Sequence, residues 1–158
     1  MADNATAQTE TSQHRFSLKR VYIKDLSYEA PASPDIFQQQ FNPNIDFNLK
    51  CKNKLITDSF YEVVLKLTVE AKQEEKTLYL VELDQAGIFD IYGIEGSQLD
   101  QVLATMCPSI LYPYAREALD SMILKGTFPP LMLDHVNFDV LYTQTLQKKA
   151  AQQEQQSK

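Results

Sequence analysis

Alternation of apolar and polar residues in the first half of the chain predicts an antiparallel sheet. In the segment NIDFNLKCK (44–52), every second residue is apolar. The segment YEVVLKLTVEA (61–71) repeats the pattern, and the polar stretch KQEEK (72–76) then leads into TLYLVELDQ (77–85). Period-two alternation is typical of strands that bury one face, and a short polar stretch between two strands is typical of a hairpin.

Two of the expected strands carry apolar residues on both faces. In TLYLVELDQ, Leu80 points to one face, whereas Tyr79, Val81 and Leu83 point to the other. A first strand at about 16–29 shows a similar mixture. Antiparallel sheets usually keep one face in water, so a strand that is apolar on both faces needs two covers. The sequence predicts few helices that could cover the second face of the sheet. We therefore expect a second copy of the chain to cover it.

The segment EAPASPDIFQQQFNPN (29–44) connects the first two strands and contains three prolines. Its length predicts a crossover loop rather than a tight hairpin. Loops this long are uncommon inside compact domains and tend to be functional. Phe37 and Phe41 make this crossover loop a candidate binding element, because a solvated loop rarely carries two large aromatic residues.

Helical spacing replaces alternation in the second half. After Ser97, a candidate N-cap, apolar residues recur every three or four positions and end at Gly126, a candidate C-cap. Pro108 and Pro113 interrupt this region and predict a break between residues 106 and 113, because proline suits the first turn of a helix. A last helix is expected to begin near Asn137.

The length of 158 residues and a hydrophobic content of 44% predict one globular domain. We expect this domain at residues 15–147, between unstructured polar tails at 1–14 and 148–158. The start of the chain is polar and contains no apolar segment, which predicts a cytoplasmic protein without a secretory signal and without direct membrane insertion.

The charge distribution argues against nucleic acid as a partner. The net charge is −6, and it is uneven along the chain. Residues 58–100 contain ten acids and three bases, a net charge of −7, whereas residues 15–57 contain seven bases and four acids, a net charge of +3. Such a charge run is usually a solvated surface, and an acidic docking face is the alternative that it leaves open.

Residues that carry catalysis or metal binding are scarce. The two cysteines, Cys51 and Cys107, form neither a disulfide framework nor a metal-ligand pattern, and we expect reduced, buried thiols. His14 and His135 are isolated, and neither a G-x-S-x-G nor an H-E-x-x-H motif occurs. The sequence therefore predicts a binding protein without a metal, cofactor or catalytic activity.

Four segments carry a family resemblance. VYIKDLSYEAP, YEVVLKLTV, GIFDIYGIEG and CPSILYPYARE…GTFPPLMLDHVNFDVLY occur in order and resemble the SecB family of bacterial protein-export chaperones over residues 15–147. The resemblance implies an α+β fold, with helices on one face of a four-stranded antiparallel sheet. It also implies a homotetramer built as a dimer of dimers, which would give the doubly apolar strands their second cover.

An activity and two partners follow from this resemblance. Proteins of this family are ATP-independent holdases that bind unfolded precursors of secretory proteins and deliver them to the SecA motor. The matching docking residues in this chain are Asp25, Glu29, Leu80 and Glu82. They would receive the zinc-containing C-terminal tail of SecA, so any zinc would belong to the partner.

Apolar residues outside the expected docking face are the candidates for client binding. They come from the crossover loop, the second strand and the last helix. The predicted client-binding groove consists of Phe37, Phe41, Ile45, Phe47, Leu49, Phe138, Leu141, Tyr142 and Leu146. For the helix residues, an ordinary core role is an equal alternative. The predicted subunit contacts are Val81, Leu83, Tyr112 and Tyr114.

Two other functions stay open at this point. One is a SecB-like chaperone dedicated to a single client, such as a component of a toxin–antitoxin system. The other is a small-molecule enzyme that uses a phenylalanine-rich cavity, which would require buried carboxylates with perturbed pKa values.

Overall fold

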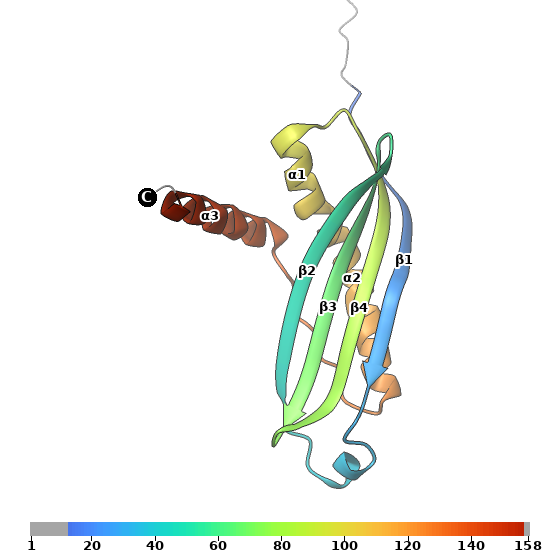
Figure 1. Cartoon of the computed structure of the whole chain (residues 1–158). Helices are drawn as coiled ribbons and strands as arrows, with labels where there is room; N and C mark the ends of the chain where they lie inside the picture. The colour runs from blue at the N-terminus through green and yellow to red at the C-terminus, as the bar shows by residue number, and fades with distance from the viewer. Residues whose placement is uncertain (1–12, 157–158) are drawn as a thin grey trace, which may run out of the picture.

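The chain folds into a four-stranded antiparallel sheet with helices on one face (Figure 1). This computed structural model describes residues 13–156, so most of the predicted first tail and residues 157–158 lie outside the described residues. The strands are β1 (Arg15–Glu29), β2 (Asn44–Thr57), β3 (Phe60–Gln73) and β4 (Lys76–Tyr92). Their order in the sheet is β1-β4-β3-β2, so β1 and β2 are the two edges. The predicted α+β architecture is confirmed.

The helical elements are a short 3-10 helix η1 (Asp35–Gln38), α1 (Gly96–Ala104), α2 (Met106–Lys125) and α3 (Phe138–Gln156). Helix α2 packs against β3 and β4, whereas α3 packs against α1 and α2 only near its start and projects away from the sheet (Figure 1). We call the face of the sheet that α2 covers the inner face and the opposite one the outer face.

Alternate residues of β3 form the centre of the core. Val63, Leu65, Leu67 and Val69 are fully buried on the inner face, as the alternation predicts. Helix α2 contributes another set of fully buried side chains, among them Leu111, Ala115 and Leu119. Burial of each large apolar side chain contributes about 1.5–3 kcal/mol relative to exposure, so this contact dominates the stability of the fold.

Two glycines allow α2 to lie close to the sheet. A Cβ atom on Gly87, in β4, would lie 2.8 Å from Leu111 Cδ2, closer than van der Waals contact permits. A Cβ atom on Gly126 would lie 1.8 Å from the hydroxyl oxygen of Tyr28. Helix α2 ends at this residue, which confirms the predicted C-cap, and the missing side chain leaves room for β1.

Two irregularities in β1 correct its sequence-based interpretation as a strand that is apolar on both faces. The register against β4 shifts between Leu18 and Arg20 and again between Ile23 and Asp25. Each inserted residue reverses which face the following side chains reach. By register, Tyr22 lies opposite Ala86 on the outer face. The other large apolar residues of β1 all fall on the inner face: Phe16, Leu18, Val21, Ile23, Leu26 and Tyr28.

Three of the four predicted subunit contacts are core residues of the single chain. Val81 and Leu83 are fully buried on the inner face, opposite Val69 and Leu67 of β3. Tyr112 is also buried, and its hydroxyl donates a hydrogen bond to the carbonyl oxygen of Asp134 at 2.7 Å. The fold of the single chain therefore leaves almost none of these three side chains exposed to another subunit. Tyr114, on α2, is 50% exposed and remains available.

The predicted break between residues 106 and 113 is also wrong. Helix α1 ends before Thr105, and α2 continues through both prolines. Pro108 lies in the first turn of α2, where no backbone donor is required. Pro113 removes one hydrogen bond inside the helix. Packing offsets this loss, because Leu111, Tyr112 and Ala115 on either side of it are buried.

Helix α3 is longer than the sequence pattern suggests. Its start is confirmed: the backbone N–H of Val140 donates to Asn137 Oδ1 at 3.1 Å, as expected of an N-cap. It continues to Gln156, so residues 148–156, expected to be unstructured, are helical. The segment lacks an apolar face, but it consists of Ala, Gln, Lys and Glu, which have high helix propensity.

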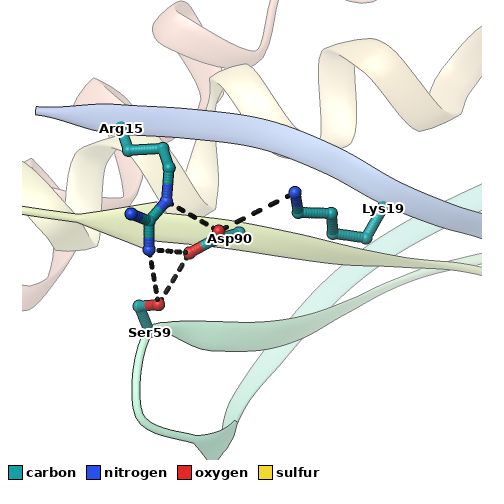
Figure 2. A network of polar contacts seen from close by, with 4 residues as sticks. All are labelled: Arg15, Lys19, Ser59 and Asp90. Atoms are coloured by element: carbon teal, nitrogen blue, oxygen red, sulfur yellow. Dashed lines mark hydrogen bonds and ion pairs between the residues drawn. The ribbon is translucent and has the colours of Figure 1, made fainter.

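A buried carboxylate ties β1 to β4 at one end of the sheet (Figure 2). Arg15 donates to both oxygens of Asp90, from Nε at 2.7 Å and from Nη2 at 3.1 Å. The Ser59 hydroxyl donates to Oδ1 at 2.6 Å, and Lys19 Nζ lies 3.9 Å from Oδ2. The hydrogen bonds from Arg15 and Ser59 lower the pKa of Asp90, because they stabilise its charged form.

This network predicts a specific loss of stability in acid. A carboxyl group with a lowered pKa stabilises the folded state above its unfolded pKa of about 3.9. This stabilisation disappears as the pH falls through the folded pKa. We expect Asp90→Asn to lower the urea midpoint at pH 7 and the two unfolding curves to converge below about pH 4.

Asp100→Asn is the matched control, because Asp100 is exposed on α1. It should leave both the midpoint and its pH dependence close to those of the original chain. Equal sensitivity to acid in Asp90→Asn and in the original chain would contradict the role assigned to Asp90.

Candidate functional site

The inner face of β2 forms an uncovered apolar surface. By register, Ile45, Phe47 and Leu49 lie opposite Ala71, Val69 and Leu67, which all belong to the inner face. Helix α2 covers β3 and β4, whereas β2 lies beside it at the edge of the sheet (Figure 1). Ile45 and Phe47 are each 39% exposed, and Leu49 is half-buried. We call these three residues the apolar strip; the structure brings them together as the alternation predicts.

An aromatic cluster lies where the crossover loop meets the end of α2. The rings of Phe37 and Phe41 lie 5.5 and 5.8 Å from the ring of Phe128. Phe128 is buried, and its ring lies 5.1 Å from that of Tyr79 in β4. Such separations are typical of favourable aromatic contacts. Phe37 is 52% exposed and Phe41 is 38% exposed, so both loop residues keep a large free surface.

Phe128 is a residue that the sequence interpretation missed. It follows Gly126 in the segment GTFPP, between the predicted C-cap and the last helix expected near Asn137. An aromatic residue beside two prolines was the available signal, because a solvated loop seldom carries one. Its contacts show that the crossover loop packs against the core at this point.

The connection after α2 lies along the core and also exposes apolar surface. The backbone N–H of Leu131 donates to Asp120 Oδ1 at 3.0 Å. The hydrogen bond from the Tyr112 hydroxyl to the carbonyl oxygen of Asp134 attaches this connection to α2 at a second point. Between these two points, the side chain of Met132 is 67% exposed. A flexible thioether of this kind adapts to varied apolar partners.

The residues predicted on the last helix have separate locations. Phe138 is buried, and its ring lies 5.9 Å from the ring of Tyr112, so it belongs to the core. Leu141 and Leu146 are exposed and Tyr142 is half-buried, all on a helix that points away from the sheet (Figure 1). Phe138 is therefore a core residue, which was the alternative interpretation of the helix residues. The structure does not bring Leu141, Tyr142 and Leu146 to the apolar strip.

The outer face brings together the four predicted docking residues. Along neighbouring strands β1 and β4, three pairs face outward in turn: Asp25 opposite Asp84, Ser27 opposite Glu82, and Glu29 opposite Leu80. Asp25 and Glu29 are exposed, whereas Leu80 and Glu82 are half-buried. We call Asp25, Glu29, Glu82 and Asp84 the acidic patch; Leu80 lies at one end of it, opposite Glu29 and next to Glu82 on the same face of β4. The sequence interpretation missed Asp84, which follows Leu80 and Glu82 on the same face of β4; the second irregularity in β1 brings Asp25 opposite it.

Basic residues occupy the neighbouring part of the outer face. Lys50, Lys52 and Lys54 follow one another on the outer side of β2, and all are exposed. Lysines on an edge strand disfavour pairing with a foreign strand. Glu62 of β3 forms ion pairs with Lys24 and with Lys54, the latter at 3.6 Å. The hydrogen bond from Lys24 lowers the pKa of Glu62. The acidic patch is thus bounded by positive charge.

The described residues offer no reactive group or metal site. Burial raises the pKa of Cys51 to about 11 and that of Cys107 to about 12, so both thiols stay protonated at neutral pH and are poor nucleophiles. Within residues 13–156, no group of three or more His, Cys, Asp or Glu side chains is arranged to hold a metal ion. None of the helices in this range is long and apolar enough to cross a membrane.

Comparisons with known proteins agree with this geometry. Residues 9–149 match the family model described as preprotein translocase subunit SecB. The chain is 51% identical over 151 residues to the protein-export protein SecB of Marinobacter nauticus, covering 94% of this chain and 92% of that protein. It is 47% identical to the protein-export protein SecB of Ectopseudomonas mendocina, covering 93% of this chain and 91% of that protein.

The fold also matches a solved structure. A SecB-like chaperone of Mycobacterium tuberculosis, solved in complex with a ChAD peptide from an antitoxin, superposes with a TM-score of 0.63. The sequence identity is 18%, and the match covers 78% of this chain and 88% of that chain. At this identity, the match shows a shared fold.

Proposed function

The chain belongs to the SecB family of protein-export chaperones, which are not enzymes, and we propose that it is a nucleotide-independent holdase for unfolded secretory proteins. The observation that carries this proposal is the separation of two surfaces on one sheet. An exposed apolar surface lies on the inner side at β2, and an acidic patch lies on the outer side at β1 and β4. One surface suits a client and the other suits a basic partner.

Client binding would begin at the apolar strip and the aromatic cluster. An unfolded chain exposes large apolar side chains, and each one that becomes buried contributes about 1.5–3 kcal/mol. Ordering the client opposes binding by several kcal/mol. Several such contacts, distributed along β2 and the crossover loop, would overcome this cost without selecting one sequence. Leu141, Tyr142 and Leu146 on α3 would form a second apolar contact surface for the same client.

Delivery would use the acidic patch. We propose that the basic, zinc-containing tail of the SecA motor binds at Asp25, Glu29 and Glu82, with Leu80 as the apolar contact among them. Opposite charges attract the tail before contact and orient it, an effect that salt screens. Because the acidic patch and the apolar strip lie on opposite faces, one chaperone would hold client and motor together, in the cytoplasm, before export.

Assembly into a homotetramer, as a dimer of dimers, is also part of the proposal. Met106, Tyr114 and Leu124 are about half exposed and lie on one side of α2 by helical spacing. Leu18 and Ile23, placed on the inner side of the β1 edge by register, are exposed beyond α2. Neighbouring subunits would cover these apolar residues. The residues of β1 would be buried between the two subunits of a pair, and those of α2 would be buried between the two pairs.

The two alternative functions have less support. The Mycobacterium tuberculosis protein is a SecB-like chaperone solved with an antitoxin peptide, whereas the relatives at 47–51% identity are protein-export proteins. A small-molecule enzyme would need perturbed carboxylates in an apolar cavity. The carboxylates with shifted pKa values, Glu62, Glu70 and Asp90, are engaged in ion pairs and hydrogen bonds that lower those values.

Replacement of Phe47 by serine should weaken client binding. Phe47 is 39% exposed, so only part of its surface is free to be buried by a client, and the expected loss is about 1 kcal/mol or fivefold in Kd. The measurement is fluorescence anisotropy with a reduced, carboxymethylated secretory protein. Asn48→Ser on the opposite face of β2 is the matched control and should bind normally. Unchanged affinity in Phe47→Ser would contradict the proposed client surface.

Charge reversal in the acidic patch should separate the two activities. We expect Asp25→Lys combined with Glu82→Lys to weaken binding of a zinc-loaded SecA tail peptide by about tenfold or more in calorimetry at low salt. Affinity for the unfolded client should stay the same. Asp46→Lys makes one such charge reversal on the outer face of β2 and should have little effect. A parallel loss of client and peptide binding would rule out separate sites.

The mass of the particle in light scattering should be about four times 18.1 kDa. Tyr114→Lys places a charge on the exposed side of α2 and should reduce the mass towards that of a pair of chains. Leu55→Lys changes a similarly exposed residue on β2 and should preserve the full mass. A monomer in solution at micromolar concentration would refute the proposed assembly.

A further inference from the structure

One side chain joins the end of β3 to the crossover loop. The amide nitrogen of Gln73, Nε2, donates to the backbone carbonyl oxygen of Gln40 at 3.0 Å. Its oxygen, Oε1, accepts from the backbone N–H of Asn42 at 2.8 Å. Both distances are those of well-formed hydrogen bonds. The two backbone groups flank Phe41, so a single side chain fixes the backbone on both sides of this aromatic residue.

The backbone ladder cannot make this connection itself. Pairing between β2 and β3 begins at Asn44 and Lys72, and the preceding residue of β2 is Pro43. Proline has no backbone N–H and cannot donate to a ladder. The primary amide of Gln73 supplies one donor and one acceptor, the two groups that a strand backbone would otherwise present. Gln73 therefore extends the sheet past Pro43 and onto the loop.

The remainder of the crossover loop is held at few points. Ile36 is buried in the core and anchors η1. A hollow of about 420 Å³ lies between the loop and the β3–β4 hairpin, lined by Ala32, Asp35 and Gln39 on one side and Lys76 and Thr77 on the other. Phe37 lies within η1, directly after the anchored Ile36. Phe41 lies outside η1, four residues further along the chain. The position of Phe41 thus depends on the contact of its backbone with Gln73 and of its ring with Phe128.

We propose that Gln73 is a positioning residue for client recognition: it holds Phe41 against Phe128, so that the aromatic cluster presents a preformed surface to large apolar side chains. This inference rests on the proposed chaperone function. Preorganisation raises affinity because the loop need not be ordered when the client arrives. The gain applies most to clients that place an aromatic or large aliphatic side chain on this cluster, so Gln73 contributes to selectivity as well as affinity.

Gln73→Ala is the test variant, and Gln38→Ala on η1 is its matched control, because Gln38 is an exposed glutamine of the same loop. Hydrogen exchange should show faster exchange of the Asn42 amide in Gln73→Ala, with the urea midpoint nearly unchanged. The Kd for an unfolded peptide rich in phenylalanine and leucine should rise about three- to tenfold. For a peptide in which valine and alanine replace these residues, the increase should be smaller.

A double-mutant cycle distinguishes positioning from a general structural role. If Gln73 acts through Phe41, then Gln73→Ala should have little further effect on peptide binding in a Phe41→Ala background. Additive losses would overturn the proposal, as would unchanged affinity in Gln73→Ala alongside reduced affinity in Phe41→Ala. If Phe41→Ala and Phe47→Ser both bind the peptides normally, the client surface itself is misplaced, and the proposed function fails rather than the role of Gln73 within it.

Discussion

The structure depends on one geometric constraint: a single helix cannot cover a four-stranded sheet. A helix with its side chains is about 10 Å wide, and four strands spaced by about 4.8 Å extend over roughly 14 Å between their axes. Helix α2 packs on the central strands β3 and β4, where the core is densest. Both edge strands therefore keep apolar inner residues that the chain itself leaves exposed. On β2 these are Ile45 and Phe47, and on β1 they are Leu18 and Ile23.

The pleat of the strands separates the two proposed activities. Along β4, Val81 and Leu83 point into the core, whereas Leu80, Glu82 and Asp84 face outward beside Asp25 and Glu29 of β1. A slip of one residue between these strands would exchange the two sets, because side chains alternate between faces. The two bonds from Arg15 of β1 to Asp90 of β4 oppose such a slip at one end of the sheet. A contact remote from the acidic patch thus helps to maintain it.

Side-chain hydrogen bonds take over where the backbone cannot pair. Gln73 continues the sheet past Pro43, and Asp120 and Tyr112 hold the connection that follows α2. These bonds decide where the exposed aromatic and aliphatic residues of the loops lie. They join residues that are 11 to 33 positions apart in the chain, and glutamine, aspartate and tyrosine are common in any polar segment. No local sequence pattern identifies them.

The sequence by itself determined the strands, the helices and the inner residues of β2 and β3, because side-chain periodicity reports directly which face of an element is buried. The family resemblance named Asp25, Glu29, Leu80 and Glu82, and the register of β1 against β4 places all four on the outer face. Tertiary structure decided the rest. Two shifts in register place most apolar residues of β1 on one face, and packing carries α2 through Pro113. Coverage by α2 makes Val81 and Leu83 core residues, and contacts with Phe138 and the connection after α2 help to bury Tyr112. Each outcome depends on contacts between distant segments, and periodicity within one segment contains no information about them.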